Sequence, residues 1–214
     1  MYVQRIIHVP ALGKNAELRA ALEERNTAGN ALAPHALSVS MFSLEPAFIH
    51  SIRFENLAAI EAYQEKQQAD ATRETWGRKI TQCLARPQAV VLYEELGAPG
   101  QTGMGSPPKY IIRNRYSPAP GKGPELQAAL QERVEKSRTA GPLGARLSRQ
   151  VASIDGPAFA VSLYFASMAA IDEFRAANAK DSSLRPFLTQ VASLVRAPMQ
   201  QRINRLLIPF STTR

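Results

Sequence analysis

The apolar residues of this chain recur with two different spacings. Leu18 and Leu22 lie four positions apart within a run of helix-forming residues, which predicts a helix over 15–28. Between Phe48 and Phe54 every second position is apolar, except for one histidine. Side chains of a strand alternate between its two faces, so this run predicts a strand with one apolar face.

The same pattern of elements occurs twice. The segment PALGKNAELRAALEER (10–25) matches PAPGKGPELQAALQER (118–133) at eleven of sixteen positions, and 46–63 resembles 157–174 in the same way. A repeat of this length predicts two copies of one supersecondary unit. The stretch between the copies is rich in Gly and Pro, which is typical of a linker. We therefore expect a first repeat, a linker and a second repeat at 1–97, 98–108 and 109–214.

Each copy predicts the element order β-α-β-β-α-β, the ferredoxin-like plan. Asn56 and Ser167 stand where helix N-caps belong, ahead of the second helical region of each copy. Such a unit is a four-stranded antiparallel sheet with helices on one face, and its bare apolar face needs a cover. We expect an α+β fold in which the two antiparallel sheets pack face to face as a barrel. The expected terminal strands of the copies are 2–9, 88–95, 110–117 and 199–209.

Composition and charge indicate the expected location of the protein and its expected partners. The one cysteine, Cys83, excludes an internal disulfide and favours a cytoplasmic location. No segment has the apolar run of a signal peptide or a membrane span, so no membrane partner is expected. The net charge is −1 over residues 1–98 and +9 over 99–214, but the basic residues are scattered. This pattern favours a solvated basic surface over a nucleic-acid site.

The opening of each copy resembles a known family. In detail the segment YIIRNRYSPAPGKGPELQAALQE resembles the start of NIPSNAP-type domains, which begin Tyr-x-Leu-Arg and pass through Pro-Gly into a helix. The whole arrangement resembles the dimeric α+β barrel superfamily. That resemblance implies haem-binding enzymes, cofactor-free oxygenases of aromatic substrates, or binding proteins. The matching residues are Tyr110, Arg113, Pro118, Gly121 and Lys122 in the second copy, and Tyr2, Arg5, Pro10 and Gly13 in the first.

All three histidines lie in the first copy, so the second copy is an internal control. His50 belongs to the apolar row of its strand and should face the helices. It is either a hydrogen-bonded core residue or a base in a pocket, where burial would lower its pKa. In related barrels the substrate pocket lies between sheet and helices, and His50 is our candidate catalytic residue. The alignment pairs His8, His35 and His50 with Tyr116, Ala145 and Val161.

Other residues are candidates for ligand binding. Trp76 and Tyr63 would form pocket walls, although Trp76 aligns with a phenylalanine and also fits a plain core role. His8 joins them as a polar candidate. Arg5 and Arg113 lie mid-strand in both copies, where each would bind a carboxylate of the other half or an anionic ligand.

No metal site or cofactor is expected. Three scattered histidines lack the converging ligands of a metal site. Fused haem proteins of the superfamily take their axial histidine from the second copy, which has none here.

Two functions remain open at this stage. The first is a small-molecule-binding protein of the NIPSNAP-like type. The alternative is a cofactor-independent oxygenase or related enzyme that acts on a small apolar or aromatic compound in the first-repeat pocket. A cavity at His50 would favour the enzyme, and a filled core there would favour binding. The outer strand edges are available for a homo-oligomer.

Overall fold

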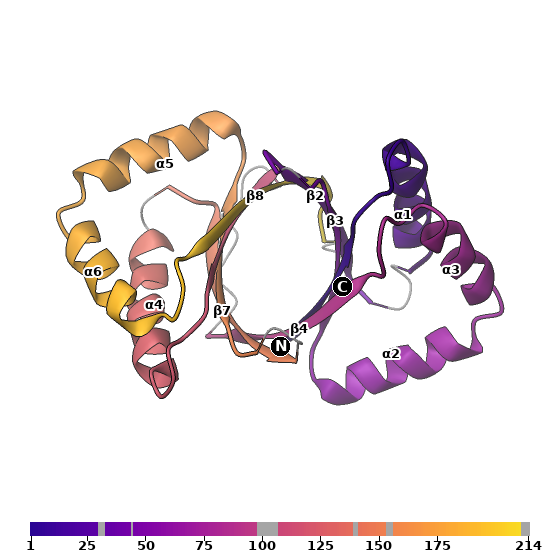
Figure 1. The fold of residues 1–214 in the computed structure, drawn as a ribbon, viewed down its shortest axis with the longest axis horizontal. Coiled ribbons are helices and arrows are strands. Elements are labelled where there is room, and N and C mark those ends of the chain that lie inside the picture. Colours follow the sequence, from indigo (N-terminus) through magenta and orange to yellow (C-terminus); the bar gives the residue numbers. More distant parts are fainter. Residues whose placement is uncertain (30–32, 44, 98–106, 139–140, 153–155, 211–214) are drawn as a thin grey trace. The chain divides into compact units, whose positions relative to one another are not determined.

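The computed structural model describes residues 1–29, 33–43, 45–97, 107–138, 141–152 and 156–210 (Figure 1). It divides into two compact units, Met1–Glu94 with the segment from Arg205, and Glu95–Asn204. Most of the expected linker, residues 98–106, lies outside the described residues. No helix in the described ranges is both long enough and apolar enough to cross a membrane.

The two repeats contain the same elements in the same order. The first repeat has β1 (Tyr2–His8), α1 (Asn15–Gly29), β2 (His35–Met41), β3 (Phe48–Phe54), α2 (Leu57–Ala69), α3 (Arg73–Thr81) and β4 (Ala89–Leu96). The second has β5 (Tyr110–Tyr116), α4 (Gly123–Arg138), β6 (Gly144–Ala152), β7 (Phe159–Phe165), α5 (Met168–Lys180), α6 (Leu184–Leu194) and β8 (Gln200–Ile208). The predicted β-α-β-β-α-β order is therefore confirmed, with each second helical region split into two helices.

Local side-chain bonds set these helix boundaries. The side chain of Asn56 accepts a hydrogen bond from the Ala59 amide, and Ser167 caps α5 in the same way, as predicted. Asp70 ends α2, and its carboxylate accepts bonds from both the amide and the hydroxyl of Thr72. These bonds turn the chain between α2 and α3.

All described strand pairs are antiparallel. β1 pairs with β3 and β4, and β2 pairs with β3, while β7 pairs with β5 and β6. The order of neighbouring strands, β1-β3-β2-β8-β5-β7-β6-β4, closes on itself. The expected α+β barrel of two ferredoxin-like repeats is confirmed.

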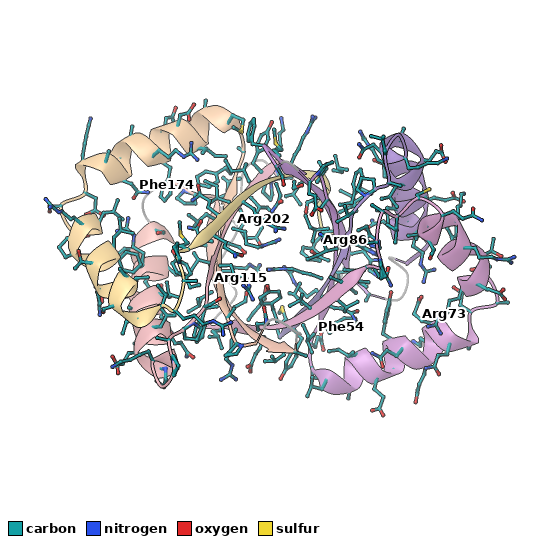
Figure 2. The ribbon with its side chains drawn as sticks, in the orientation of Figure 1. Phe54, Arg73, Arg86, Arg115, Phe174 and Arg202 are labelled. Atoms are coloured by element: carbon teal, nitrogen blue, oxygen red, sulfur yellow. The ribbon has the colours of Figure 1, made fainter. Side chains whose placement is uncertain are left out.

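Within each repeat the helices cover one face of the sheet, and the core lies between them (Figure 1). In the second repeat Phe174 of α5 points toward the sheet, and its ring centroid lies 5.4 Å from that of Phe165 (Figure 2). In the first repeat Phe54 and Tyr63 make the equivalent contact at 5.3 Å. The two helix layers are therefore packed alike, which makes their differences informative.

The spacing of Trp76, Ile80, Cys83 and Leu84 predicts that these four residues share one apolar helix face, but the helix that forms is shorter. Trp76 and Ile80 lie on α3, but the helix ends at Thr81, before Cys83 and Leu84. Leu84 instead forms an isolated β-bridge with Pro10. Cys83 remains buried in the apolar cluster of the first repeat, where it packs as a small hydrophobic side chain.

Candidate functional site

Three polar side chains form a connected row inside the first repeat. His50 Nε2 lies 2.9 Å from His35 Nδ1, and the Tyr63 hydroxyl lies 3.5 Å from His35 Nε2. His50 is on β3, His35 begins β2, and Tyr63 reaches them from α2. Both imidazoles are buried among apolar side chains. We call these three residues the imidazole chain.

Strand register explains why the two histidines meet. His35 pairs with Ile52 and Leu37 pairs with His50, so the two imidazoles are diagonal neighbours on one face of the sheet. That face is the one the helices cover, as we predicted for His50. Contact with Tyr63 of α2 places His35 there as well.

Burial keeps both imidazoles neutral at ordinary pH. It lowers the pKa of His35 to about 4, with a smaller contribution from the charge of Arg25. Burial, and then the neighbouring His35, His8 and Arg25, lower the pKa of His50 well below its usual value. Burial also raises the pKa of Tyr63, so its hydroxyl stays protonated.

A chain of neutral groups has two complete proton arrangements. In the first, His50 Nε2–H donates to His35, and His35 Nε2–H donates to the Tyr63 oxygen. In the second, the Tyr63 hydroxyl donates to His35, and His35 Nδ1–H donates to His50. A proton taken up at His50 Nδ1 and released at Tyr63 converts the first arrangement into the second.

Further polar atoms in this repeat are buried without a partner among the described residues. His8 is 2% exposed, and neither of its ring nitrogens has one. Asn26 of α1 is fully buried with both amide atoms unpaired. Burial lowers the pKa of His8 to about 4. Each unpaired buried group costs roughly 1–3 kcal/mol, a cost that a polar ligand or water would offset.

Arg25 of α1 forms polar contacts with the carboxyl-terminal end of α2. It donates to Gln67 Oε1 and lies 3.4 Å from the Asp70 carboxylate. The second repeat has the equivalent contact between helices, in which Arg133 donates to Asp181 and Asn178, each at 2.7 Å. This arginine contact is therefore common to both repeats, whereas the imidazole chain occurs only in the first.

The second repeat has apolar residues where the first has the imidazole chain. Ala145 pairs with Leu163 as His35 pairs with Ile52, and Leu147 pairs with Val161 as Leu37 pairs with His50. The counterparts of His35, His50 and Tyr63 are the buried Ala145, Val161 and Phe174. Apolar side chains are therefore sufficient to fill the core at these positions.

A pocket of about 200 Å³ lies between sheet and helices in the second repeat. The residues that line it include Tyr116, Val161, Phe174 and Phe187, with the amides of Asn114 and Gln201. Gln201 donates to Asn114 at 2.9 Å. The first-repeat counterparts of the four non-amide residues are His8, His50, Tyr63 and Trp76, which are our sequence candidates.

The remaining candidates lie elsewhere. Trp76 is half-buried on α3, with Lys79 Nζ 4.9 Å from its ring centroid. Arg5 pairs with Ser51 on β3 and is therefore on the sheet face opposite His50. The Arg5 guanidinium lies 4.1 Å from the ring centroid of Tyr93, and Arg113 Nε lies 3.4 Å from Ser162 Oγ. These arginines do not join the imidazole chain.

Sequence reasoning missed two members of the site. His35 drew no role from its alignment with Ala145, although a buried polar residue in place of an apolar one is itself a signal. Asn26 of α1 aligns with Val134, which gives the same signal. Within the described ranges no group of three or more His, Cys, Asp or Glu is arranged to hold a metal ion.

Comparison with known proteins supports the fold. A crystal structure from Fusobacterium nucleatum, of a protein provisionally assigned as a monooxygenase, matches with a TM-score of 0.76 at 9% identity, over 99% of this chain and 94% of that one. One from Lactobacillus acidophilus with the same provisional assignment matches with a TM-score of 0.66 at 11% identity, over 100% and 99%. An anthrone oxidase-like protein matches with a TM-score of 0.65 at 11% identity, over 99% and 93%.

No family model matches the sequence, and no curated protein sequence matches it. Identities near one tenth establish a shared fold and nothing finer. The chain has the dimeric α+β barrel fold with both halves in one polypeptide. The NIPSNAP resemblance stays a prediction.

Proposed function

We propose that this protein is a cofactor-independent oxygenase, or a related enzyme, that acts on a small apolar or aromatic compound in the helix-covered layer of the first repeat. The observation that carries the proposal is the imidazole chain, which is buried and has no counterpart in the second repeat. The provisional monooxygenases and the anthrone oxidase-like protein among the structural neighbours support this class of reaction over simple binding.

His50 is the proposed base. It would take a proton from the substrate at Nδ1, the ring nitrogen that does not face His35. Its Nε2 proton would pass to His35, and the His35 Nε2 proton would pass to Tyr63, whose own hydroxyl proton leaves. The positive charge therefore need not stay on a buried imidazole whose pKa is low.

Loss of that proton prepares an aromatic substrate for oxygen. A carbanion or phenolate is electron-rich, and dioxygen as co-reactant would accept its electrons. For a methylene group the balanced outcome is a carbonyl and one water, with one oxygen atom in each product. The apolar surroundings of His50 suit a neutral aromatic substrate, because a neutral apolar ring enters them without losing favourable hydration.

The unpaired atoms of His8 and Asn26 would position the substrate. Both are buried donors or acceptors without a described partner, and the second repeat has Tyr116 and Val134 at the equivalent positions. A substrate with a hydroxyl or carbonyl group would satisfy them. Phenols and cyclic ketones fused to an aromatic ring are the first compounds to test.

Oxygen uptake tests the proposal. A panel of such compounds should reveal at least one that the protein oxidises, and His50→Val should abolish that uptake. Val is the residue that the second repeat packs at this position. Phe174→Tyr, which adds a hydroxyl at the equivalent of Tyr63, is the matched control and should leave uptake unchanged. Uptake that persists in His50→Val would refute the role of the imidazole chain.

Non-catalytic binding is the second candidate. It is favoured by the second-repeat pocket, which combines apolar walls with amide groups and has no carboxylate or imidazole among the lining residues that the structure describes. Saturable binding without turnover in wild type would support a NIPSNAP-like binding protein. A cytoplasmic location is part of either proposal and rests on the single cysteine.

A further inference from the structure

A row of three polar side chains lines the second-repeat pocket between sheet and helices. Gln201 Nε2 donates a hydrogen bond to Asn114 Oδ1 at 2.9 Å, and the Asn114 amide donates to the Tyr116 oxygen. Asn114 and Tyr116 lie on β5 and pair with Val161 and Phe159, so they share the sheet face that the helices cover. We call Tyr116, Asn114 and Gln201 the amide row.

The amide row can form more hydrogen bonds than these two, which are the ones it makes among the residues that the structure describes. Burial raises the pKa of Tyr116 to about 12, so its hydroxyl stays protonated and can donate. A side-chain amide has two N–H donors and one oxygen acceptor, so Gln201 keeps its oxygen and one N–H for a ligand. The row therefore presents donors and an acceptor side by side without a formal charge.

The first repeat has apolar residues in place of the two amides. Ile6 pairs with Val90 between β1 and β4, and these residues are the counterparts of Asn114 and Gln201. The pairing of these strands therefore does not require amides at the two positions. The pocket that the amides line gives them a different role, which is recognition of a ligand.

The lining of the pocket includes large apolar side chains that are exposed. Leu188 of α6 and Met199, which precedes β8, are 50% and 38% exposed. Their first-repeat counterparts are Gly77 and Gln88, which offer no such surface. Exposed large apolar side chains beside a cavity favour an apolar ligand.

Two arginines also belong to the lining, and neither extends the amide row. Arg133 donates to Asp181 and Asn178, so its charge is compensated at the helices. Arg175 is exposed on α5. A ligand held by the amide row should be neutral, because burying an anion against uncharged groups removes hydration that these groups do not replace.

We propose that this pocket binds a small neutral aromatic compound that carries a carboxamide group. Its ring would pack against Val161, Phe174 and Phe187. Its carbonyl would accept a hydrogen bond from the Tyr116 hydroxyl, and its N–H would donate to Gln201 Oε1.

The volume of the pocket suits a single ring. A cavity of about 150 Å³ holds benzene, so this pocket of about 200 Å³ has room for one ring with a small polar substituent. The proposal rests on the second candidate function, non-catalytic binding, for which it names the ligand class. It does not depend on the proposed oxygenase activity of the first repeat.

Binding of four single-ring compounds, followed through the side-chain amide NMR signals of Asn114 and Gln201, tests the proposal. Benzamide should shift both signals saturably and bind at least about tenfold more tightly than ethylbenzene, which has no polar group, and than benzoate, which is charged. Acetophenone, which has the carbonyl without the N–H, should have an intermediate affinity. Benzoate that binds as tightly as benzamide would show that arginine charge recognises the ligand, and would overturn the proposal.

Substitutions of the amide row make the test specific. Asn114→Ile with Gln201→Val installs the first-repeat residues and should remove most of the preference for benzamide over ethylbenzene. Because Gln201 is exposed, Gln201→Val alone leaves the core intact and should reduce this preference by about threefold or more. Gln190→Ala with Gln200→Ala removes two exposed amides outside the pocket lining and should leave the preference unchanged.

A first-repeat variant separates this site from the imidazole chain. His50→Val should leave benzamide binding unchanged, and loss of binding in this variant would contradict a site in the second repeat. Saturable binding without a preference for benzamide would overturn the ligand class and leave non-catalytic binding standing. If none of the four compounds shifts the two amide signals, the site itself is refuted, whatever oxygen uptake shows for the first repeat.

Discussion

The Nε2 atom of His50 lies 2.9 Å from the Nδ1 atom of His35, and both rings are buried. One of these nitrogens must donate and the other accept, because two bare lone pairs would repel at this distance. The pair therefore has a defined tautomer at any moment, and Tyr63 shares in setting it.

The Tyr63 hydroxyl is predicted to matter for turnover and little for folding. Tyr63→Phe removes the outer end of the imidazole chain and leaves the ring contact with Phe54, which the second repeat makes with Phe174. We expect kcat for oxygen uptake to fall by about tenfold or more, with a small change in stability. Unchanged kcat in Tyr63→Phe would remove Tyr63 from the proton path.

Substitutions of His35 and His50 should have non-additive effects on the free energy of unfolding. His35→Ala leaves His50 buried without its partner and should lower the free energy of unfolding by roughly 1–3 kcal/mol. Adding His50→Val should recover much of that loss, because it restores the apolar pair that the second repeat packs. Urea unfolding of both single variants and the double variant gives the coupling. Additive losses would contradict the hydrogen bond.

Removing an unpaired buried amide should stabilise the free protein. Asn26→Val installs the residue found at the equivalent position of α4, and it removes two buried atoms without described partners. We expect a gain of about 1 kcal/mol or more in the absence of ligand. The same variant should bind the substrate of the first repeat more weakly, since Asn26 is proposed to position it. A loss of stability would show that Asn26 has a partner.

Stability should fall on mild acidification because of the first repeat. Unfolded histidines take up protons near their ordinary pKa of 6.5, whereas burial lowers the pKa of His8 and His35 to about 4. The contribution of these two neutral histidines to the free energy of unfolding is fully present above about pH 6.5. It is lost as the pH falls toward about 4, and the loss is roughly 3 kcal/mol for each histidine.

Urea midpoints at several pH values in this window measure the effect. The variant His8→Tyr/His35→Ala/His50→Val carries the second-repeat residues and should lose far less stability between the same pH values. Asp181 does not confound this window, since its lowered pKa, caused first by Arg133 and Ser183, places its effect at lower pH. An identical pH profile for the variant would contradict the assignment.

The sequence predicted the elements and the side of the sheet on which His50 lies. The repeat fixed the element order, and short-range caps such as Asn56 fixed helix starts, because these signals are local. The His35–His50 contact was out of reach, since it depends on the register between β2 and β3.

Strand alternation could have shown that two of the predicted ligand-binding residues, Arg5 and His8, do not share one site. Arg5 and His8 are an odd number of positions apart on β1, which places them on opposite faces and in different surroundings.

Side-chain ¹⁵N NMR of the histidines, recorded while aromatic phenols and ketones are added, tests the central claim most directly. We predict that His35 and His50 appear as neutral tautomers near pH 7 and that their signals move together, and saturably, with at least one compound. His50→Val should abolish the response of His35. If every compound leaves the three imidazole signals unmoved, the first repeat is a filled core and the imidazole chain is not an active site.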